Sequence, residues 1–105
     1  MDEDAHAYEG VSRAYKIPKN DPGRVQAIDE ALLAAARPPA EVVKRGRRLL
    51  ALAQTIEQIG NKNAVSDARV AAMLAKTAID GATENVNANL SGMTDRARAK
   101  ESGVG

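Results

Sequence analysis

Two long segments with helical periodicity are joined by the stretch Gly60-Asn61-Lys62-Asn63-Ala64-Val65-Ser66-Asp67. Gly60 can take the left-handed conformation that ends many helices, and Ser66 is a typical N-cap residue for the helix that follows. The stretch therefore predicts a turn between two helices. On this interpretation the remaining polar residues have no structural task and are the first candidates for a functional site: Asn61, Lys62, Asn63 and Asp67.

The chain on both sides of this stretch predicts an all-α fold, an antiparallel helical bundle of about four helices. We expect the helices to cover residues 1–15, 21–38, 39–59 and 67–90. Asp21 and Pro22 form a helix start signal, and Pro38-Pro39 should end that helix, because proline lacks the N–H that a helix interior needs. We expect the helical domain to span residues 1–95 and a frayed or disordered tail to span residues 96–105.

Composition narrows the class of the protein. A chain of 105 residues forms one small domain, and without cysteine it has neither disulfides nor thiolate metal sites. The 15 basic and 14 acidic residues nearly balance, which argues against nucleic acid and membranes as partners. With no apolar stretch of membrane-spanning length and no signal-peptide pattern, we expect a cytoplasmic protein. Tyr8 and Tyr15 are the only aromatic residues, so the core is thin, and we expect oligomerisation to complete it.

Helical spacing assigns residues to faces. Val42, Leu49 and Ile56 lie one heptad apart and are expected to face the core. At about 100° per residue, one face of the helix expected over residues 67–90 carries Asp67, Val70, Ala71, Leu74, Ala78, Gly81, Asn85 and Asn89. Asp67 and Asn85 are about 27 Å apart along the axis at about 1.5 Å per residue. A site that uses both residues therefore requires another helix or another subunit.

Four motifs occur in order along the chain: Asp2-Glu3-Asp4-Ala5 with Ala7-Tyr8, then Ile17-Pro18-Lys19, then the stretch 60–67, then Asn85-Val86-x-x-Asn89-Leu90. In order and approximate spacing, over about residues 1–95, they resemble the cyclodeaminase/cyclohydrolase family of folate enzymes. The stretch 60–67 is the most specific of them.

The resemblance implies an all-helical homodimer that works in folate one-carbon metabolism. Cyclodeaminases of this family close 5-formiminotetrahydrofolate to the 5,10-methenyl form and release ammonia. Cyclohydrolases add water to the methenyl form and yield 10-formyltetrahydrofolate. The resemblance implies a tetrahydrofolate derivative as the substrate and no metal or redox cofactor. Either activity fits the motifs.

Two features depart from the family pattern. The family domain normally has an N-terminal half with a Gly-Gly-Gly-Ser-type segment, which this sequence does not contain. Arg69 takes the place of the small residue, usually glycine, that follows Ser-Asp-Ala. We therefore expect residues 1–95 to be the C-terminal half of such a domain, completed by a separate N-terminal half or by a homo-oligomer. The alternative is a catalytically inactive, self-associating helical module derived from the family.

The resemblance also suggests roles for individual residues. Asp67 would stabilise the cationic carbon or orient the attacking water as a carboxylate, and Asp4 would be a general acid. The substrate-binding candidates are Asn61, Lys62, Asn85 and Asn89. A structural interpretation stays open for each: the carboxylates suit a helix N-terminus, the lysine is a solvated charge, and the asparagines at 85 and 89 bond groups across a helix interface.

Two further polar features have ordinary explanations. The basic run Lys44-Arg45-Gly46-Arg47-Arg48 lies inside an expected helix, where consecutive residues point in different directions. We expect it to form a solvated face, with attraction of anionic polyglutamyl folate as the alternative. His6 is the only histidine and is expected at the surface.

Overall fold

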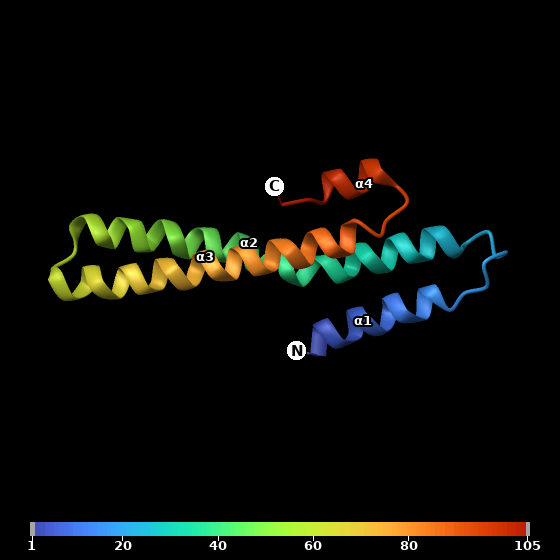
Figure 1. Ribbon diagram of the computed structural model, residues 1–105, viewed down its shortest axis with the longest axis horizontal. Coiled ribbons are helices and arrows are strands. Elements are labelled where there is room, and N and C mark those ends of the chain that lie inside the picture. Colours follow the sequence, from blue (N-terminus) through green and yellow to red (C-terminus); the bar gives the residue numbers. More distant parts are fainter. Residues whose placement is uncertain (1, 105) are drawn as a thin grey trace.

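The computed structural model describes the backbone of residues 2–104 and the side chains of residues 8–104. Its helices are α1 (Asp2–Tyr15), α2 (Arg24–Ile59), α3 (Lys62–Leu90) and α4 (Arg96–Glu101). The described residues contain no strand, so the predicted all-α class is confirmed. Helices α2 and α3 form a long antiparallel hairpin, which is the body of the molecule (Figure 1).

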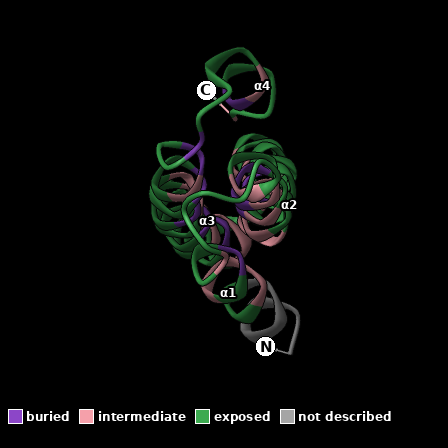
Figure 2. Cartoon of the chain, turned by 90° about the vertical axis from the view of Figure 1, so that its right-hand side faces the viewer, coloured by how far each residue is buried: buried purple, intermediate pink, exposed green. Residues whose placement is uncertain are grey.

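The other two helices lie on opposite faces of this hairpin. Seen along its length, α1 is on one face and α4 on the other (Figure 2). The molecule measures 64 × 28 × 13 Å, so it is a thin, elongated stack of three layers. α1 packs against the first part of α2, at the end of the hairpin where α2 begins (Figure 1).

The largest hydrophobic cluster lies where all four helices meet. Its buried residues come from every helix and from the segment before α4: Ala14, Ile28, Leu32, Ala36, Val86, Leu90, Met93 and Ala99. Toward the turn that joins α2 and α3, the buried residues are smaller: Val43, Gly46, Ala53, Ala68 and Ala75. The molecule therefore has a well-packed base and a tip that consists of two helices with a narrow seam.

α2 continues through Pro38 and Pro39 without a break, so the expected helix end at residue 38 is wrong. Neither proline has an N–H, and the carbonyls of Ala34 and Ala35 therefore lose their usual i+4 donors. The helix continues because both of its halves pack against the same partner, α3, and tertiary packing provides most of a helix's stability in a protein.

The connector also differs from expectation. Gly60 is extended, with φ −80° and ψ 162°, and is not left-handed. α3 begins at Lys62, five residues earlier than predicted, because the side chain of Asn61 and not that of Ser66 is the N-cap. Ser66 therefore lies inside the helix, and Asp67 lies in its second turn instead of at its start.

On both α2 and α3, the face that is buried is rotated by a fraction of a turn from the face predicted to be buried. Val42, Leu49 and Ile56 are between 43% and 46% exposed, whereas Val43, Gly46 and Ala53 are buried against α3. On α3, the buried residues are Ala68, Ala75 and Ala82, while Val70 and Leu74 are exposed. We call Val42, Leu49, Ile56, Val70 and Leu74 the open stripe.

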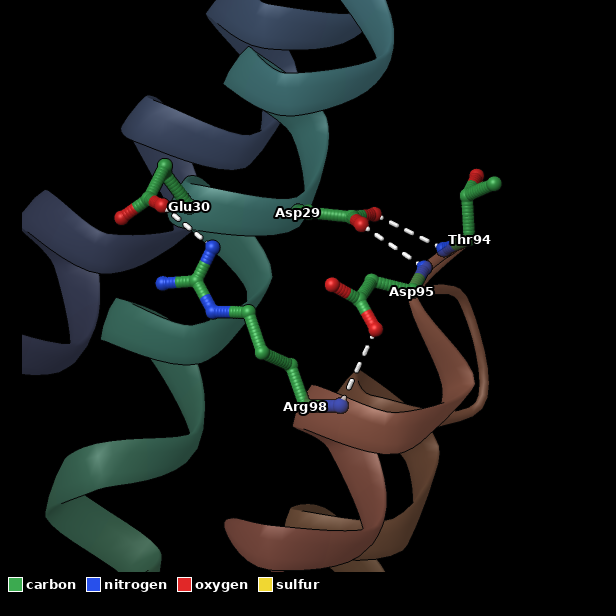
Figure 3. A network of polar contacts seen from close by, with 5 residues as sticks. All are labelled: Asp29, Glu30, Thr94, Asp95 and Arg98. Atoms are coloured by element: carbon green, nitrogen blue, oxygen red, sulfur yellow. Dashed lines mark hydrogen bonds and ion pairs between the residues drawn. The ribbon is translucent and has the colours of Figure 1, made fainter.

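The segment after α3 is ordered over the range where we expected a frayed tail. α4 covers Arg96–Glu101 and buries Ala99, and the buried carboxylate of Asp29 holds its start (Figure 3). The Oδ1 of Asp29 accepts a hydrogen bond from the backbone N–H of Thr94 at 2.8 Å, and its Oδ2 accepts one from Asp95 at 2.9 Å. The expected tail is therefore wrong for this helix.

An ion pair at the surface adds a second link between α4 and α2. Arg98 donates to Glu30 at 2.7 Å, and both side chains are about half exposed. The hydrogen bond to Glu30, followed by the charge of that carboxylate, raises the pKa of Arg98 above its ordinary value. The guanidinium therefore keeps its charge throughout the neutral pH range.

Candidate functional site

A groove of about 650 Å³ lies between α1, α2 and α3. None of the residues that line it is charged, and most are apolar. They are Tyr8 and Val11 from α1, Ala35, Pro38, Pro39 and Val42 from α2, and Ala78, Ala82, Asn85 and Asn89 from α3. A large apolar groove with a few polar groups is the usual form of a small-molecule site. It is the candidate site of this chain.

The two asparagines are the polar side chains of this groove. They lie four residues apart and therefore share one face of α3. The Nδ2 of Asn89 donates to the backbone carbonyl of Asn85 at 2.9 Å, which leaves its Oδ1 available. The side chain of Asn85 is exposed and makes no hydrogen bond to another described residue. Asn85 therefore offers a ligand both an N–H donor and a carbonyl acceptor.

The proline pair contributes to the wall opposite the asparagines. Pro38 and Pro39 line the groove, and so does Ala35, whose carbonyl lacks its usual helical donor. The pair therefore provides a rigid apolar surface beside a backbone acceptor. Neither these prolines nor Tyr8 was predicted from the sequence as a site residue. The sequence feature that could have identified them is the proline pair, because prolines inside an apolar helical pattern either end a helix or alter its surface.

Asp67 lies far from the groove. It is exposed, and about 27 Å of helix separates it from Asn85 at about 1.5 Å per residue, because α3 is continuous between them. The carboxylate of Asp67 accepts no hydrogen bond from another described residue and is therefore exposed to a ligand or a partner. A single copy of the chain does not bring together the two ends of the predicted site.

Asn61 and Lys62 lie at the hairpin turn, close to Asp67 and remote from the groove. The Oδ1 of Asn61 accepts a hydrogen bond from the backbone N–H of Ala64 at 3.0 Å, which makes it the N-cap of α3. The expectation that Asn61 has no structural task is therefore wrong. Lys62 is the exposed first residue of the helix.

The remaining candidates are placed as follows. Asp4 and His6 lie within α1, but their side chains fall outside the described part of the structure.

Arg69 donates to Glu57 across the hairpin at 2.8 Å, so this departure from the family pattern has a local ion-pair partner. In the basic run, Arg45 pairs with Glu41, and Arg47 donates to the carbonyl of Val104.

The described residues show neither a metal-binding cluster nor a membrane-spanning helix. No group of three or more His, Cys, Asp or Glu side chains within residues 8–104 is placed to hold a metal ion. In the part of the chain that the structure describes, no helix is both long and apolar enough to cross a membrane.

Comparisons with known proteins identify relatives over nearly the whole chain. The sequence profile of the formiminotransferase-cyclodeaminase family matches residues 1–103. The methenyltetrahydrofolate cyclohydrolase of Methylorubrum extorquens is 36% identical over 103 residues, which are 94% of this chain and 50% of that protein. The formimidoyltransferase-cyclodeaminases of Rattus norvegicus and Gallus gallus are 36% and 30% identical over 99 residues, 90% of this chain and 18% of each relative.

The chain thus spans about half of the bacterial relative and less than a fifth of the two animal ones. The match over residues 1–103 includes all four motifs and the three helices that form the groove. The chain belongs to the formiminotransferase-cyclodeaminase family.

Proposed function

We propose that this chain works in folate one-carbon metabolism, as part of a methenyltetrahydrofolate cyclohydrolase or a formiminotetrahydrofolate cyclodeaminase. The groove carries the proposal: in a chain of this family, it combines apolar walls with the exposed carboxamide of Asn85, which bonds to no other side chain among residues 8–104. The substrate would be a tetrahydrofolate derivative, and the proposal involves no metal and no redox cofactor.

The groove suits a flat, polar-edged ring such as a pterin. A volume of about 650 Å³ accommodates a drug-sized molecule. The ring of Tyr8 and the faces of Pro38 and Pro39 offer apolar surface to the ring plane. Asn85, the free Oδ1 of Asn89 and the carbonyl of Ala35 offer donors and acceptors to its edge.

Both candidate reactions involve a cationic carbon between two nitrogens and need proton transfers. A carboxylate stabilises such a cation and accepts the proton of an attacking water. In our proposal Asp67 has this role, with Asp4 as a second acid or base, while Asn61 and Lys62 position the substrate. Because Asp67 lies far from the groove of its own chain, the working site needs a second polypeptide: another copy, or the other half of the family domain.

The proposal places the protein in the cytoplasm, where free tetrahydrofolate derivatives are accessible to it. The lack of a membrane-spanning helix in the described residues and the near balance of charges agree with that location.

Exposed apolar residues along the open stripe support an oligomer as the working form.

The test is the loss of methenyltetrahydrofolate absorbance over the spontaneous rate, with ammonia release from formiminotetrahydrofolate measured in parallel. We expect Asn85→Ala to lower kcat/KM by roughly tenfold, the effect of losing about 1.4 kcal/mol of hydrogen bonding to the substrate. Asn87→Ala is the matched control, because Asn87 is also exposed on α3 but does not line the groove. Equal loss in the two variants would contradict the groove as the site.

One observation favours the alternative, an inactive self-associating module. Asn61 in the connector and Arg69 just after it have structural partners in the fold, so these two residues need no substrate to explain them. On that alternative the chain never exceeds the spontaneous rate of hydrolysis, alone or together with the other half of the bacterial cyclohydrolase domain. Ligand-free self-association would then be its only measurable property.

A further inference from the structure

The groove differs in character between its two ends. Its polar side chains, Asn85 and Asn89, are the lining residues of α3 that lie nearest the base of the hairpin. Toward the hairpin turn it ends in the apolar side chains of Val42 on α2 and Ala78 on α3. Since no lining residue is charged, the groove suits the uncharged part of a ligand, with its hydrogen-bonding edge at the base.

Arg45 lies just beyond the apolar end of this groove. It follows Val42 at the same three-residue step that leads from Ala35 to Pro38, two residues of the lining. At about 100° per residue, these four positions lie within about 80° of one another on α2. The side chain of Arg45 is 76% exposed. A positive charge therefore follows the lining, about 15 Å of helix from Ala35 at about 1.5 Å per residue.

The hydrogen bond of Arg47 supports this assignment of faces. Arg47 donates to the backbone carbonyl of Val104 at 2.7 Å, on the side of the hairpin that carries α4 (Figure 2). Arg45 is about 200° from Arg47 around α2 and so belongs to the opposite side, which carries α1 and the groove. The basic run 44–48 is therefore divided between two faces, and of its charged residues only Arg45 continues the lining.

The guanidinium of Arg45 has donors that its own chain does not use. Its Nε donates to the Oε1 of Glu41 at 3.3 Å, and an exposed pair of this kind holds its partners only weakly. Neither Nη group makes a hydrogen bond to another residue among 8–104. A guanidinium presents its donors as a planar fork, which matches the two oxygens of a carboxylate. Arg45 can therefore bind an anionic group at the end of the groove.

We propose that Arg45 selects a ligand with a carboxylate at one end and fixes the direction in which that ligand lies. A neutral ring with a hydrogen-bonding edge lies at Asn85 and Asn89, an apolar middle passes Val42, and the carboxylate pairs with Arg45. The assignment rests on the proposed function, which supplies the ligand: a tetrahydrofolate derivative has a ring at one end and glutamate carboxylates at the other. Its carboxylates would point toward the hairpin turn.

The reverse direction is unfavourable on electrostatic grounds. It would place the carboxylate at the base of the groove, beside neutral carboxamides and the backbone carbonyl of Ala35, whose oxygen repels an anion. Arg24, at the start of α2, already donates to the carbonyls of Ile17 and Tyr15. A carboxylate that leaves water without a cationic partner loses free energy. Only the end at Arg45 compensates that loss.

Binding of two probes to the full chain tests the role of Arg45. 5-Formyltetrahydrofolate carries the ring and the glutamate carboxylates, whereas 6-methyltetrahydropterin carries the ring alone. In isothermal titration calorimetry, Arg45→Gln should weaken binding of the first probe by about fivefold, the upper range for a solvent-exposed charge pair, and leave the second unchanged. Lys44→Gln is the matched control. It removes the same charge from an exposed neighbour that points about 100° away, and it should affect neither probe.

A second variant should act in the opposite direction. Glu41→Gln removes the carboxylate that competes for the guanidinium, so it should strengthen binding of 5-formyltetrahydrofolate and leave 6-methyltetrahydropterin unchanged. Salt at about 1 M should remove both effects, because it screens exposed charges. If the pair of Arg45 and Glu41 served only the helix, the two variants would shift binding in the same direction.

The outcomes separate this inference from the proposed function. Equal effects of Arg45→Gln on the two probes, or equal effects of Arg45→Gln and Lys44→Gln, would overturn the role of Arg45. If Asn85→Ala then still weakens both probes, the proposed function stands without it. Binding that follows the expected pattern in a protein without folate activity would support the role of Arg45 and contradict the proposed function. A parent protein that binds neither probe would overturn both.

Discussion

The carboxamide of Asn61 determines where α3 begins. Its Oδ1 accepts the backbone N–H of Ala64, one of the four N–H groups at a helix start that have no partner in the helix. Asn63, two residues later, makes no side-chain hydrogen bond within the described residues. The two asparagines of this turn therefore differ, because only Asn61 caps the helix with its side chain.

We expect Asn61→Ala to lower the free energy of unfolding by about 1 kcal/mol, the usual loss when a helix N-cap is removed. Asn63→Ala should change it by less than about 0.5 kcal/mol, as surface substitutions do. Urea unfolding followed by circular dichroism measures both. If the two variants lose equal stability, the cap is not the reason for this start of the helix.

At this scale the sequence predicted the turn but not the residue that makes it. Both Asn61 and Ser66 are good N-cap residues, and nothing local ranks one above the other. In the structure α2 ends at Ile59 and the Oδ1 of Asn61 accepts the N–H of Ala64, so α3 begins only two residues after the end of α2. The prediction that residues 60–67 connect two helices is confirmed, while the start at Asp67 is wrong.

Among the elements, α2 and α3 depend on a close approach at Gly46. A Cβ at this position would lie 2.7 Å from the Cγ1 of Ile79, closer than side chains tolerate. The glycine therefore lets two helices with small buried residues come together. It also explains why the predicted inner faces were displaced: the seam follows Val43, Gly46 and Ala53, and the heptad of larger residues lies beside it.

We expect Gly46→Ala to destabilise the protein by about 1–3 kcal/mol, the usual effect of overpacking a core. Gly10→Ala is the control in α1, where a Cβ meets no atom within 4 Å, and it should stabilise by about 0.5–1 kcal/mol through helix propensity. Thermal unfolding of the two variants should therefore shift in opposite directions. A gain in both would show that Ile79 moves aside without loss.

The proline pair shows the limit of prediction for whole elements. Because proline lacks the backbone N–H that a helix interior needs, an isolated helix would be expected to end at Pro38. α2 continues because α3 supports it on both sides of the prolines. The sequence therefore predicted the helical content of residues 24–59 but not their continuity, and it missed the part of the groove that the prolines form.

In the molecule as a whole, Asp29 connects the beginning of α2 to the segment that precedes α4. Its buried carboxylate accepts two backbone N–H groups that lie 65 and 66 residues away and so anchors the segment before α4 on α2. A single sequence gives no sign of such a pair, which is why residues 96–101 were predicted to fray. The predicted site residues show the same limit, because Asp67 and Asn85 lie far apart on α3 in a single copy of the chain.

We expect Asp29→Ala to lower the free energy of unfolding by about 1–3 kcal/mol, because two part-buried backbone N–H groups lose their acceptor. Glu30→Ala should lower it by less than about 1 kcal/mol, since its pair with Arg98 is exposed. Limited proteolysis after α3 should be faster for Asp29→Ala only. Equal cleavage of both variants would mean that the ion pair, and not the buried carboxylate, anchors α4.

The missing donors of Pro38 and Pro39 have a consequence for motion. They interrupt the ladder of hydrogen bonds near the middle of the longest helix, at the border between the well-packed base and the narrow tip. Cooperative opening in proteins follows such borders. We therefore expect hydrogen exchange at the tip of the hairpin to be faster than in the base. A ligand or a partner that binds across the border would suppress that opening and so join the two units into one.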